Sequence, residues 1–331
     1  MEYLRALLGE LLSPVNQVRA GAETRLNDLK ATNGSSLLIN LVAVVCDDAN
    51  KDPSSEWTRS LGIILLKGIT TRDADLWKQL QPAEFAESRG QLLALLHRES
   101  VPRAKRLLII TLAALARLQQ WDELMACVGQ LASSEVESNK LLGISILDKL
   151  AEYVGQHLLT HLESVASFLC PVLNRVSSLS GAGEKNDEEL STMAAAAQAL
   201  CSVMHEMDEQ EYIQHPLCQY LLAAAHVGLL LSDASRDNQA TSEEVFSSLV
   251  SLAQDRPRLF QQSFTAMSQQ VLLPLIGSAA AASVESSIKS LALDMGCSLL
   301  SHPECRLEGT FDNSALREGF LHAAMVLATA I

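Results

Sequence analysis

Amphipathic helices separated by short breaks recur along the whole chain, with about forty-five residues to each pair of helices. A single pair would leave an apolar face in water, so neighbouring pairs must stack and bury a continuous core. The pattern predicts an all-α helical-repeat solenoid. Proteins of this class bind other molecules along an extended surface.

A polar or acidic residue precedes the second helix of each predicted pair. Such a side chain can accept a hydrogen bond from the free N–H groups of the first turn, and a carboxylate there also suits the helix dipole. We expect second helices to begin at Ser13-Pro14, Ser54-Ser55-Glu56, Ser100-Val101-Pro102, Ser134-Glu135, Asp187-Glu188, Thr241 to Glu244 and Ser283-Val284-Glu285. Behind the third start, Ala104, Leu108, Thr111 and Leu115 form an apolar stripe at helical spacing.

The partner helices fall between these starts, and no sustained alternation typical of strands appears. Asn33-Gly34 reads as a helix stop. The partner helices are expected near residues 2–11, 36–46, 84–97, 121–132, 157–176, 211–231, 259–276 and 313–331.

No Pro/Gly-rich linker divides the chain, so we predict one elongated domain over residues 1–331. Two stretches read as enlarged loops within a pair, near 177–187 and 233–240. The last helix, from Asn313 to Ile331, ends without a polar capping element, which solenoids ordinarily have. We therefore expect an N-terminal portion of a longer protein.

The chain is acidic, with a net charge of −14. Binding nucleic acid through its phosphates requires a basic face, so direct nucleic-acid binding is not expected and basic protein partners are favoured. Seven scattered cysteines indicate free thiols in a reducing compartment. Cys46, Cys127, Cys170, Cys201 and Cys297 lie inside apolar helical runs and are expected to be buried. The uncharged stretches near 107–117 and 271–284 are shorter than a membrane span, so no membrane insertion is expected.

No catalytic site is expected, nor any cofactor or metal. His157 and His161 stand four residues apart, as two metal ligands on one helix face would, but Leu158 occupies the position of the Glu in HExxH. A surface pair is the preferred interpretation. The stretch 181–185 lacks the spacing of a phosphate-binding loop.

Repeat length favours the HEAT or armadillo classes over tetratricopeptide and ankyrin repeats. The three tryptophans, Trp57, Trp77 and Trp121, do not form the ladder of armadillo proteins, whereas the segment from Pro14 to Ala22 resembles a HEAT unit. We predict a HEAT-repeat α-solenoid, a right-handed superhelix of antiparallel helix pairs with about seven and a half repeats.

Three segments resemble the importin-beta, or karyopherin-beta, family. The first two are 11–29 and 60–80, where Leu65-Leu66-Lys67-Gly68-Ile69 is followed by Trp77; family members frequently have Asn at the position of Gly68. The third, 242–277, is similar to repeats of importin-five-type receptors. The resemblance makes 1–100 an importin-beta N-terminal-like region and 101–331 further HEAT repeats.

This resemblance implies a nuclear transport receptor that shuttles between cytoplasm and nucleus. The first repeats would bind the GTP form of the small GTPase Ran, basic protein cargo would lie on the inner face, and phenylalanine-glycine nucleoporins would bind between outer helices. Binding of Ran-GTP would release the cargo. The alternative is a HEAT scaffold of a phosphatase or trafficking coat that does not bind Ran.

Helix geometry nominates residues for the Ran surface. On the helix that begins near Ser54, we assign Trp57, Leu61 and Ile64 to the core, which places Arg59, Ile63 and Lys67 on the open face. Equivalent open positions on neighbouring helices complete the predicted Ran-binding set, Lys67, Arg59, Glu23, Asn27 and Arg106. We predict that Lys67→Glu weakens binding of the GTP form.

Overall fold

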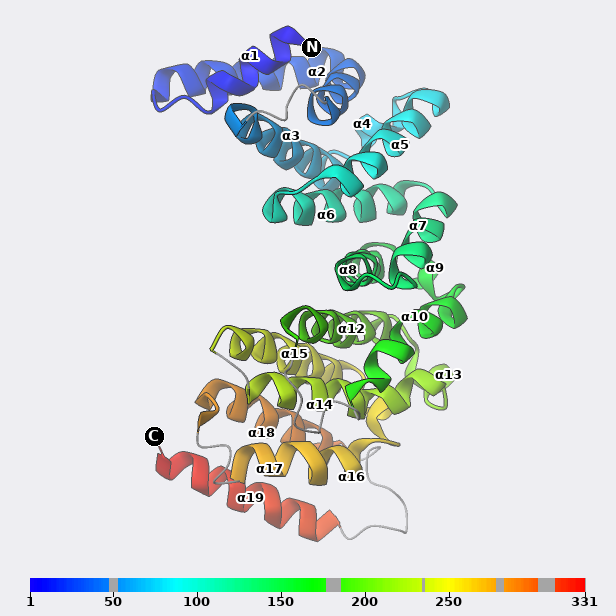
Figure 1. The fold of residues 1–331 in the computed structure, drawn as a ribbon, viewed down its shortest axis with the longest axis vertical. Coiled ribbons are helices and arrows are strands. Elements are labelled where there is room, and N and C mark those ends of the chain that lie inside the picture. Colours follow the sequence, from blue (N-terminus) through cyan, green and yellow to red (C-terminus); the bar gives the residue numbers. More distant parts are fainter. Residues whose placement is uncertain (48–52, 177–185, 234–235, 278–282, 303–312, 331) are drawn as a thin grey trace. The chain divides into compact units, whose positions relative to one another are not determined.

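The computed structural model describes residues 1–47, 53–176, 186–233, 236–277, 283–302 and 313–330. All regular structure in these residues is helical, and none of them lies in a strand (Figure 1). The prediction of an all-α chain built from helix pairs is confirmed. The chain forms two compact units, Met1–Leu124 (unit 1) and Met125–Ile331 (unit 2), which are described separately.

Unit 1 contains helix pairs whose second members, α2, α3 and α6, pack side by side in that order. Helix α5 packs on α2 and on α6, and α4 is a short helix that packs on α2. The bounds are α1 Glu2–Leu11, α2 Asn16–Cys46, α3 Pro53–Arg72, α4 Asp75–Lys78, α5 Pro82–Arg98 and α6 Pro102–Leu118.

Helix α2 combines two of the expected helices into one kinked helix. Asn33 has non-helical angles, φ −150° and ψ 55°, at the position where a helix stop was predicted. Beyond the kink, Gly34 lies against the side chain of Leu76, and the Cys46 thiol donates to the carbonyl of Gln91 on α5. The predicted break therefore exists as a bend and not as a loop.

By length and composition alone, α2 could cross a membrane, with a mean hydropathy of 1.4 in its most apolar window. Its apolar part is the half after the kink. There Leu38, Leu41, Val42 and Val45 are fully or almost fully buried in unit 1. These core side chains account for part of the hydropathy of α2, since 39% of its most apolar window is buried.

In unit 2, helices α8, α12, α15 and α18 form a row in which each packs on the next (Figure 1). Their first residues are Glu137, Asp187, Arg236 and Ser286, at intervals of 50, 49 and 50 residues. This interval exceeds the roughly 34 residues of a tetratricopeptide unit and lies nearer the HEAT length. The row helices are α8 Glu137–Val154, α12 Asp187–His205, α15 Arg236–Asp255 and α18 Ser286–Ser301.

The other helices of unit 2 cover this row, with α10 and α14 on α12, α14 also on α15, and α17 and α19 on α18. Gly143 of α8 lies so close to α7 that a β-carbon there would stand 2.7 Å from the Ala132 nitrogen. The longer helices are α7 Asp122–Ala132, which begins at the end of unit 1, α10 Leu162–Asn174, α14 Tyr220–Ser232 and α19 Asn313–Ala330. Short helical segments are α9 Gln156–Leu159, α13 Glu209–Tyr212, η2 Pro216–Gln219, η3 Pro257–Phe260, α16 Phe264–Met267, η4 Ser268–Leu272 and α17 Leu273–Gly277.

The polar residues that signalled helix starts lie slightly outside the positions expected for caps. Ser13 and Ser134 accept hydrogen bonds from the N–H groups of Val15 and Val136, each at 3.2 Å, and these valines are themselves the N-cap residues. At α12 the side chain of the cap residue itself, Asn186, accepts from the first turn, at 3.1 Å from Glu188 N. The signals therefore locate these helices to within three residues.

The observed start of helix α15 differs from the prediction and also shortens a predicted loop. It begins at Arg236, five residues before Thr241, so residues 236–240 are helical and not part of an enlarged loop. Ser242 is fully buried, and its hydroxyl donates to the carbonyl of Gly228 on α14, at 2.7 Å. The other expected loop falls mainly on 177–185, outside the described residues, while α12 begins at Asp187 as predicted.

The predicted apolar stripe of α6 is confirmed, because Ala104, Leu108, Thr111 and Leu115 are all fully buried. The cysteines differ in burial more than expected. Among the described residues, all are free thiols; Cys201 is buried, whereas Cys297 is exposed. The prediction that Cys297 is buried was wrong, since the packed side of α18 is made by Ile288, Ala292 and Met295 and their neighbours.

Candidate partner-binding surface

The residues predicted to bind Ran lie on the second helices of unit 1. Glu23 and Asn27 are exposed on the first half of α2, Arg106 is exposed on α6, and Lys67 is partly exposed on α3. The exposed residues of α6 also include Arg103 and Arg117, so this helix presents three arginines to solvent. Four of the five nominated residues are thus accessible to a partner.

The predicted orientation of α3 was wrong. Ile63 and Leu66 are fully buried, whereas Trp57 is 69% exposed and Ile64 is 39% exposed. The error arose because Leu61 to Leu66 is apolar on nearly every side, so its sequence does not fix which side packs. Trp57 was placed in the core because it lies on one helical stripe with Leu61 and Ile64.

Arg59 lies on the packed side of α3 and forms a bidentate ion pair with Glu99. Its Nε and Nη2 atoms stand 2.9 and 3.3 Å from the carboxylate oxygens. The Glu99 side chain is 1% exposed and that of Arg59 14%, and Glu99 also accepts from the Val101 N–H at 2.9 Å. Arg59 therefore connects α3 to the turn between α5 and α6 and is not an exposed contact residue.

Trp77, which supports the family resemblance, also belongs to the core. It is 2% exposed, and its indole N–H donates to the hydroxyl of Thr70 at 3.0 Å. Its ring lies edge-on to Phe85, at 5.9 Å between centroids. The guanidinium of Arg89 lies 4.9 Å from the ring centres of both Phe85 and Trp121, and burial lowers its pKa. This aromatic group fixes the turn between α3 and α5.

The two units differ sharply in charge. Residues 1–124 contain fifteen Lys and Arg and fifteen Asp and Glu, so unit 1 is neutral. Residues 125–331 contain the remaining ten basic and twenty-four acidic side chains, and hence the whole net charge of −14. Sequence composition taken over the full chain conceals this difference.

An open groove of about 700 Å³ crosses the row of unit 2 where α8, α12 and α15 meet. Lys149 is its single basic side chain, and it already pairs with Asp148 at 3.2 Å and with Glu152 at 2.8 Å. The groove is therefore acidic and rich in hydroxyl groups. It is lined by Asp148, Lys149, Gln198, Ser202, Ala240, Glu243, Glu244, Ser247 and Ser248.

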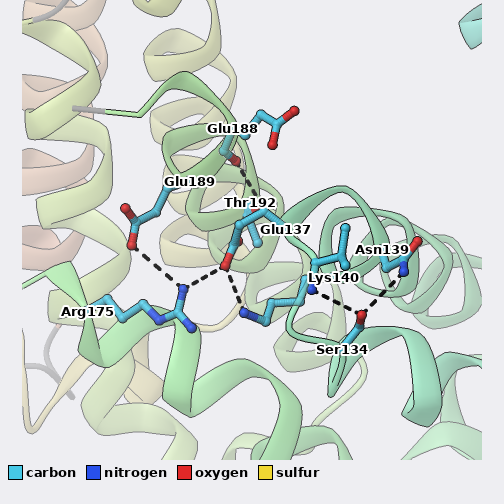
Figure 2. Close-up of polar contacts among 9 residues, drawn as sticks. Ser134, Glu137, Asn139, Lys140, Arg175, Glu188, Glu189 and Thr192 are labelled. Atoms are coloured by element: carbon cyan, nitrogen blue, oxygen red, sulfur yellow. Dashed lines mark hydrogen bonds and ion pairs between the residues drawn. The ribbon is translucent and has the colours of Figure 1, made fainter. Parts of the chain in front are cut away.

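A second polar group joins α8, α12 and the residue that follows α10 (Figure 2). The Glu137 carboxylate accepts from Lys140 at 2.8 Å and from Arg175 at 2.9 Å, and Arg175 lies 3.7 Å from Glu189. Burial acts to raise the pKa of Glu137, but the hydrogen bonds from Lys140 and Arg175 outweigh it and hold that pKa below its ordinary value. These contacts join α8 and α12 to the end of α10.

Nothing in the described part of the chain resembles a metal site, since no three His, Cys, Asp or Glu side chains are grouped there. His157 and His161 are both exposed, as predicted. They do not share a helix, however, because α9 ends at Leu159 and α10 begins at Leu162. Residues 181–185 lie outside the described residues.

Comparisons with known proteins identify the kind of solenoid. A family model described as "IPO5-like, TPR repeats" matches residues 110–270. No curated protein sequence matches the chain. Among solved structures, Kap121p bound to Nup53p aligns with 98% of this chain at 17% identity and a TM-score of 0.74. Kap121p bound to Ste12p aligns with 98% at 19% identity and 0.74, and Kap121p bound to RanGTP with 98% at 17% identity and 0.69.

These matches confirm the predicted solenoid of HEAT type and the resemblance to importin-five-type karyopherins. The chain spans 28 to 29% of the length of the Kap121p structures it matches. What the Kap121p structures bind is a property of those proteins. For this chain, a functional proposal starts from the exposed arginines of α6 in unit 1 and the acidic groove of unit 2.

Proposed function

We propose that this chain, importin-five-like over residues 110–270 and folded like the karyopherin Kap121p, forms part of a nuclear transport receptor. It would bind the GTP form of a Ran-type small GTPase, carry protein cargo and move between cytoplasm and nucleus. The observation that carries the proposal is the pairing of a karyopherin fold with two chemically different surfaces, one on each unit.

Unit 1 supplies the surface proposed for Ran. It is neutral overall, and the exposed side of α6 presents Arg103, Arg106 and Arg117. A neutral surface with local basic groups does not repel an acidic partner, as the strongly acidic unit 2 would. Lys67 lies partly exposed on the adjacent helix α3, and Lys67→Glu is predicted to weaken binding of the GTP form.

Unit 2 supplies the surface proposed for cargo. The groove between α8, α12 and α15 contains Asp148, Glu243 and Glu244, and its one lysine is already paired with carboxylates. Basic segments of a cargo protein would find both charge complementarity and hydrogen-bond partners there. Release of cargo by Ran-GTP would be a coupling between the two surfaces, and by linkage cargo would weaken Ran-GTP binding by the same factor.

Nucleoporin binding would require apolar clefts between outer helices. One candidate, a cleft of about 510 Å³, lies where α10 and α14 meet. Its apolar lining comes from Leu173, Val176, Leu222 and Ala223, next to the ring of Tyr220, and the rest of its lining is polar, from Asn174, Gln219, His226 and Gln270. A phenylalanine side chain could enter such a cleft, which makes it the part of unit 2 suited to this class of partner.

A pull-down with Ran loaded with GTP or with GDP tests the proposal. The receptor function predicts retention of the GTP form and little of the GDP form. Equal retention, or none, would instead favour a HEAT scaffold without Ran binding. Lys67→Glu and Arg72→Glu form a matched pair, because both residues lie on α3 and only Lys67 was assigned to the contact surface.

A further inference from the structure

The carboxylates of the unit 2 groove already accept hydrogen bonds from the chain itself. Both oxygens of Asp148 are engaged, since Oδ1 accepts from the Ser202 hydroxyl at 2.6 Å and Oδ2 lies 3.2 Å from Lys149 Nζ. The other two carboxylates accept from neutral donors on neighbouring row helices, which are Gln198 for Glu244, at 3.2 Å, and Ser287 for Glu243, at 3.5 Å. A basic partner therefore meets acceptors that are in use.

These donors differ in how readily a basic partner can replace them. Charge-assisted hydrogen bonds are about twice as strong as neutral ones, so an incoming ammonium gains when it replaces the Ser202 hydroxyl on Asp148. The same ammonium gains nothing when it replaces Lys149, because one ammonium then takes the place of another. Among the residues that line the groove, Lys149 is thus the donor that competes with a partner's lysine on equal terms.

Lys149 is held at this position by two carboxylates. Besides Asp148, it contacts Glu152 Oε2 at 2.8 Å, and its side chain is 36% exposed. Burial acts to lower the pKa of Lys149, but the hydrogen bond with Glu152 and the charge of Asp148 outweigh it, so this pKa is raised and the ammonium stays charged at neutral pH. Its flexible four-carbon stem can still leave Asp148 without any change in the backbone of α8.

We propose that Lys149 is an internal competitor of the basic partner, because its ammonium occupies the position on Asp148 that a lysine of the partner would take. This inference rests on the function proposed for the groove. Every basic partner must displace Lys149, so the groove binds more weakly than its carboxylates alone would. The competition limits the affinity for cargo and thereby eases its release.

The test measures the affinity of the whole chain for a fluorescent oligolysine peptide by anisotropy. It is done at physiological ionic strength, where charges more than about 8 Å apart are largely screened. Lys149→Met removes the competitor and should tighten binding about five-fold or more, which corresponds to the upper range of a surface ion pair. The same variant should unfold at a lower temperature, because Asp148 and Glu152 lose their shared cation.

Two variants control for charge and for structure. Arg317 is exposed on α19 and does not line the groove, so Arg317→Met changes the net charge of the chain equally, from −14 to −15, and should change affinity by less than about two-fold. Lys149→Arg keeps a cation beside Asp148 and should also stay within about two-fold. A purely structural role for Lys149 would lower the stability of Lys149→Met without tightening its binding.

The outcomes separate this inference from the proposed function. If Glu243→Gln combined with Glu244→Gln leaves the affinity of the chain for oligolysine unchanged, the peptide does not bind in the groove and the cargo surface is wrong. If that double variant weakens binding but Lys149→Met binds within about two-fold of Arg317→Met, Lys149 is not a competitor and the cargo surface stands. Far-UV circular dichroism checks that each variant is folded, and Lys149→Gln replaces Lys149→Met if the latter is not.

Discussion

Replacing Arg59 by alanine should destabilise unit 1 far more than its position on a solenoid surface suggests. The change leaves the Glu99 carboxylate, 1% exposed, without the bidentate partner that neutralises it. Removing one member of a buried ion pair costs about 3 to 5 kcal/mol, because the remaining charge stays buried. Arg59 is 14% exposed and Glu99 keeps its hydrogen bond from Val101, so we expect the lower end of that range.

The assay uses the position of the tryptophans. Trp57, Trp77 and Trp121 all lie in unit 1, so tryptophan fluorescence follows this unit without a contribution from unit 2. For a unit of this size, about 3 kcal/mol corresponds to a fall in melting temperature of roughly 10 °C. Far-UV circular dichroism, which detects both units, should show that the transition of unit 2 is unchanged.

Arg72→Ala is the matched control for this prediction. Arg72 lies on the same helix, carries the same charge and is exposed, so its loss should change stability by less than about 0.5 kcal/mol. The reasoning is refuted if the fluorescence transition of Arg59→Ala coincides with that of Arg72→Ala. Such a result would mean that the Glu99 carboxylate tolerates the loss of its guanidinium, as only a well-hydrated group would.

Three further predictions concern unit 2. Gly143→Ala should destabilise unit 2 by about 1 to 3 kcal/mol, because the new β-carbon would stand 2.7 Å from a backbone nitrogen of α7. Urea unfolding followed by circular dichroism measures this change, and a stabilised variant would contradict the prediction. At pH 8, iodoacetamide should label the exposed Cys297 well before Cys201, because burial raises the pKa of Cys201 to about 12. Peptide mass spectrometry measures the order of labelling, and faster labelling of Cys201 would disprove the prediction. The pKa of Glu137 is held below its ordinary value of 4.5, so its contribution to stability is present above pH 4.5 and lost as pH falls through the lower folded-state pKa. Glu137→Gln should therefore flatten the plot of unfolding free energy against pH in that acidic window. An unchanged slope would count against the assigned contacts.

The sequence predicts the fold well because the solenoid depends on a repeated local signal. Each helix needs only an apolar stripe and a start, and both are visible in α6, whose stripe from Ala104 to Leu115 is buried as expected. The resemblance to the importin-beta family was based on segments 11–29 and 60–80, and the resemblance to importin-five-type receptors on 242–277, whereas the family model covers 110–270. The spacing of the repeats was thus as informative as the motif around Lys67.

Helix orientation was predicted less well, and the reason is visible in α3. Its apolar residues Leu61, Ile63, Ile64, Leu65 and Leu66 surround the helix, so no helical wheel identifies the packed side. The decisive contacts are tertiary: Gly62 lies against Val45 of α2, and Arg59 pairs with Glu99. Neither pairing is encoded within α3 itself.

The surface chemistry was also only partly predictable. The net charge pointed to basic partners for the chain as a whole, but its confinement to residues 125–331 emerges only when the two units are counted separately. The exposure of Trp57 could not be foreseen, since a tryptophan on an amphipathic helix is more often a core residue. The prediction of one domain over 1–331 stays a prediction.

Calorimetric titration of the chain with GTP-loaded and GDP-loaded Ran tests the central claim most directly. We expect measurable binding of the GTP form, at least ten-fold weaker binding of the GDP form, and a reduced affinity for the GTP form when a basic cargo peptide occupies the acidic groove of unit 2. Equal affinity for both nucleotide states would contradict the account, whatever the fold of the chain.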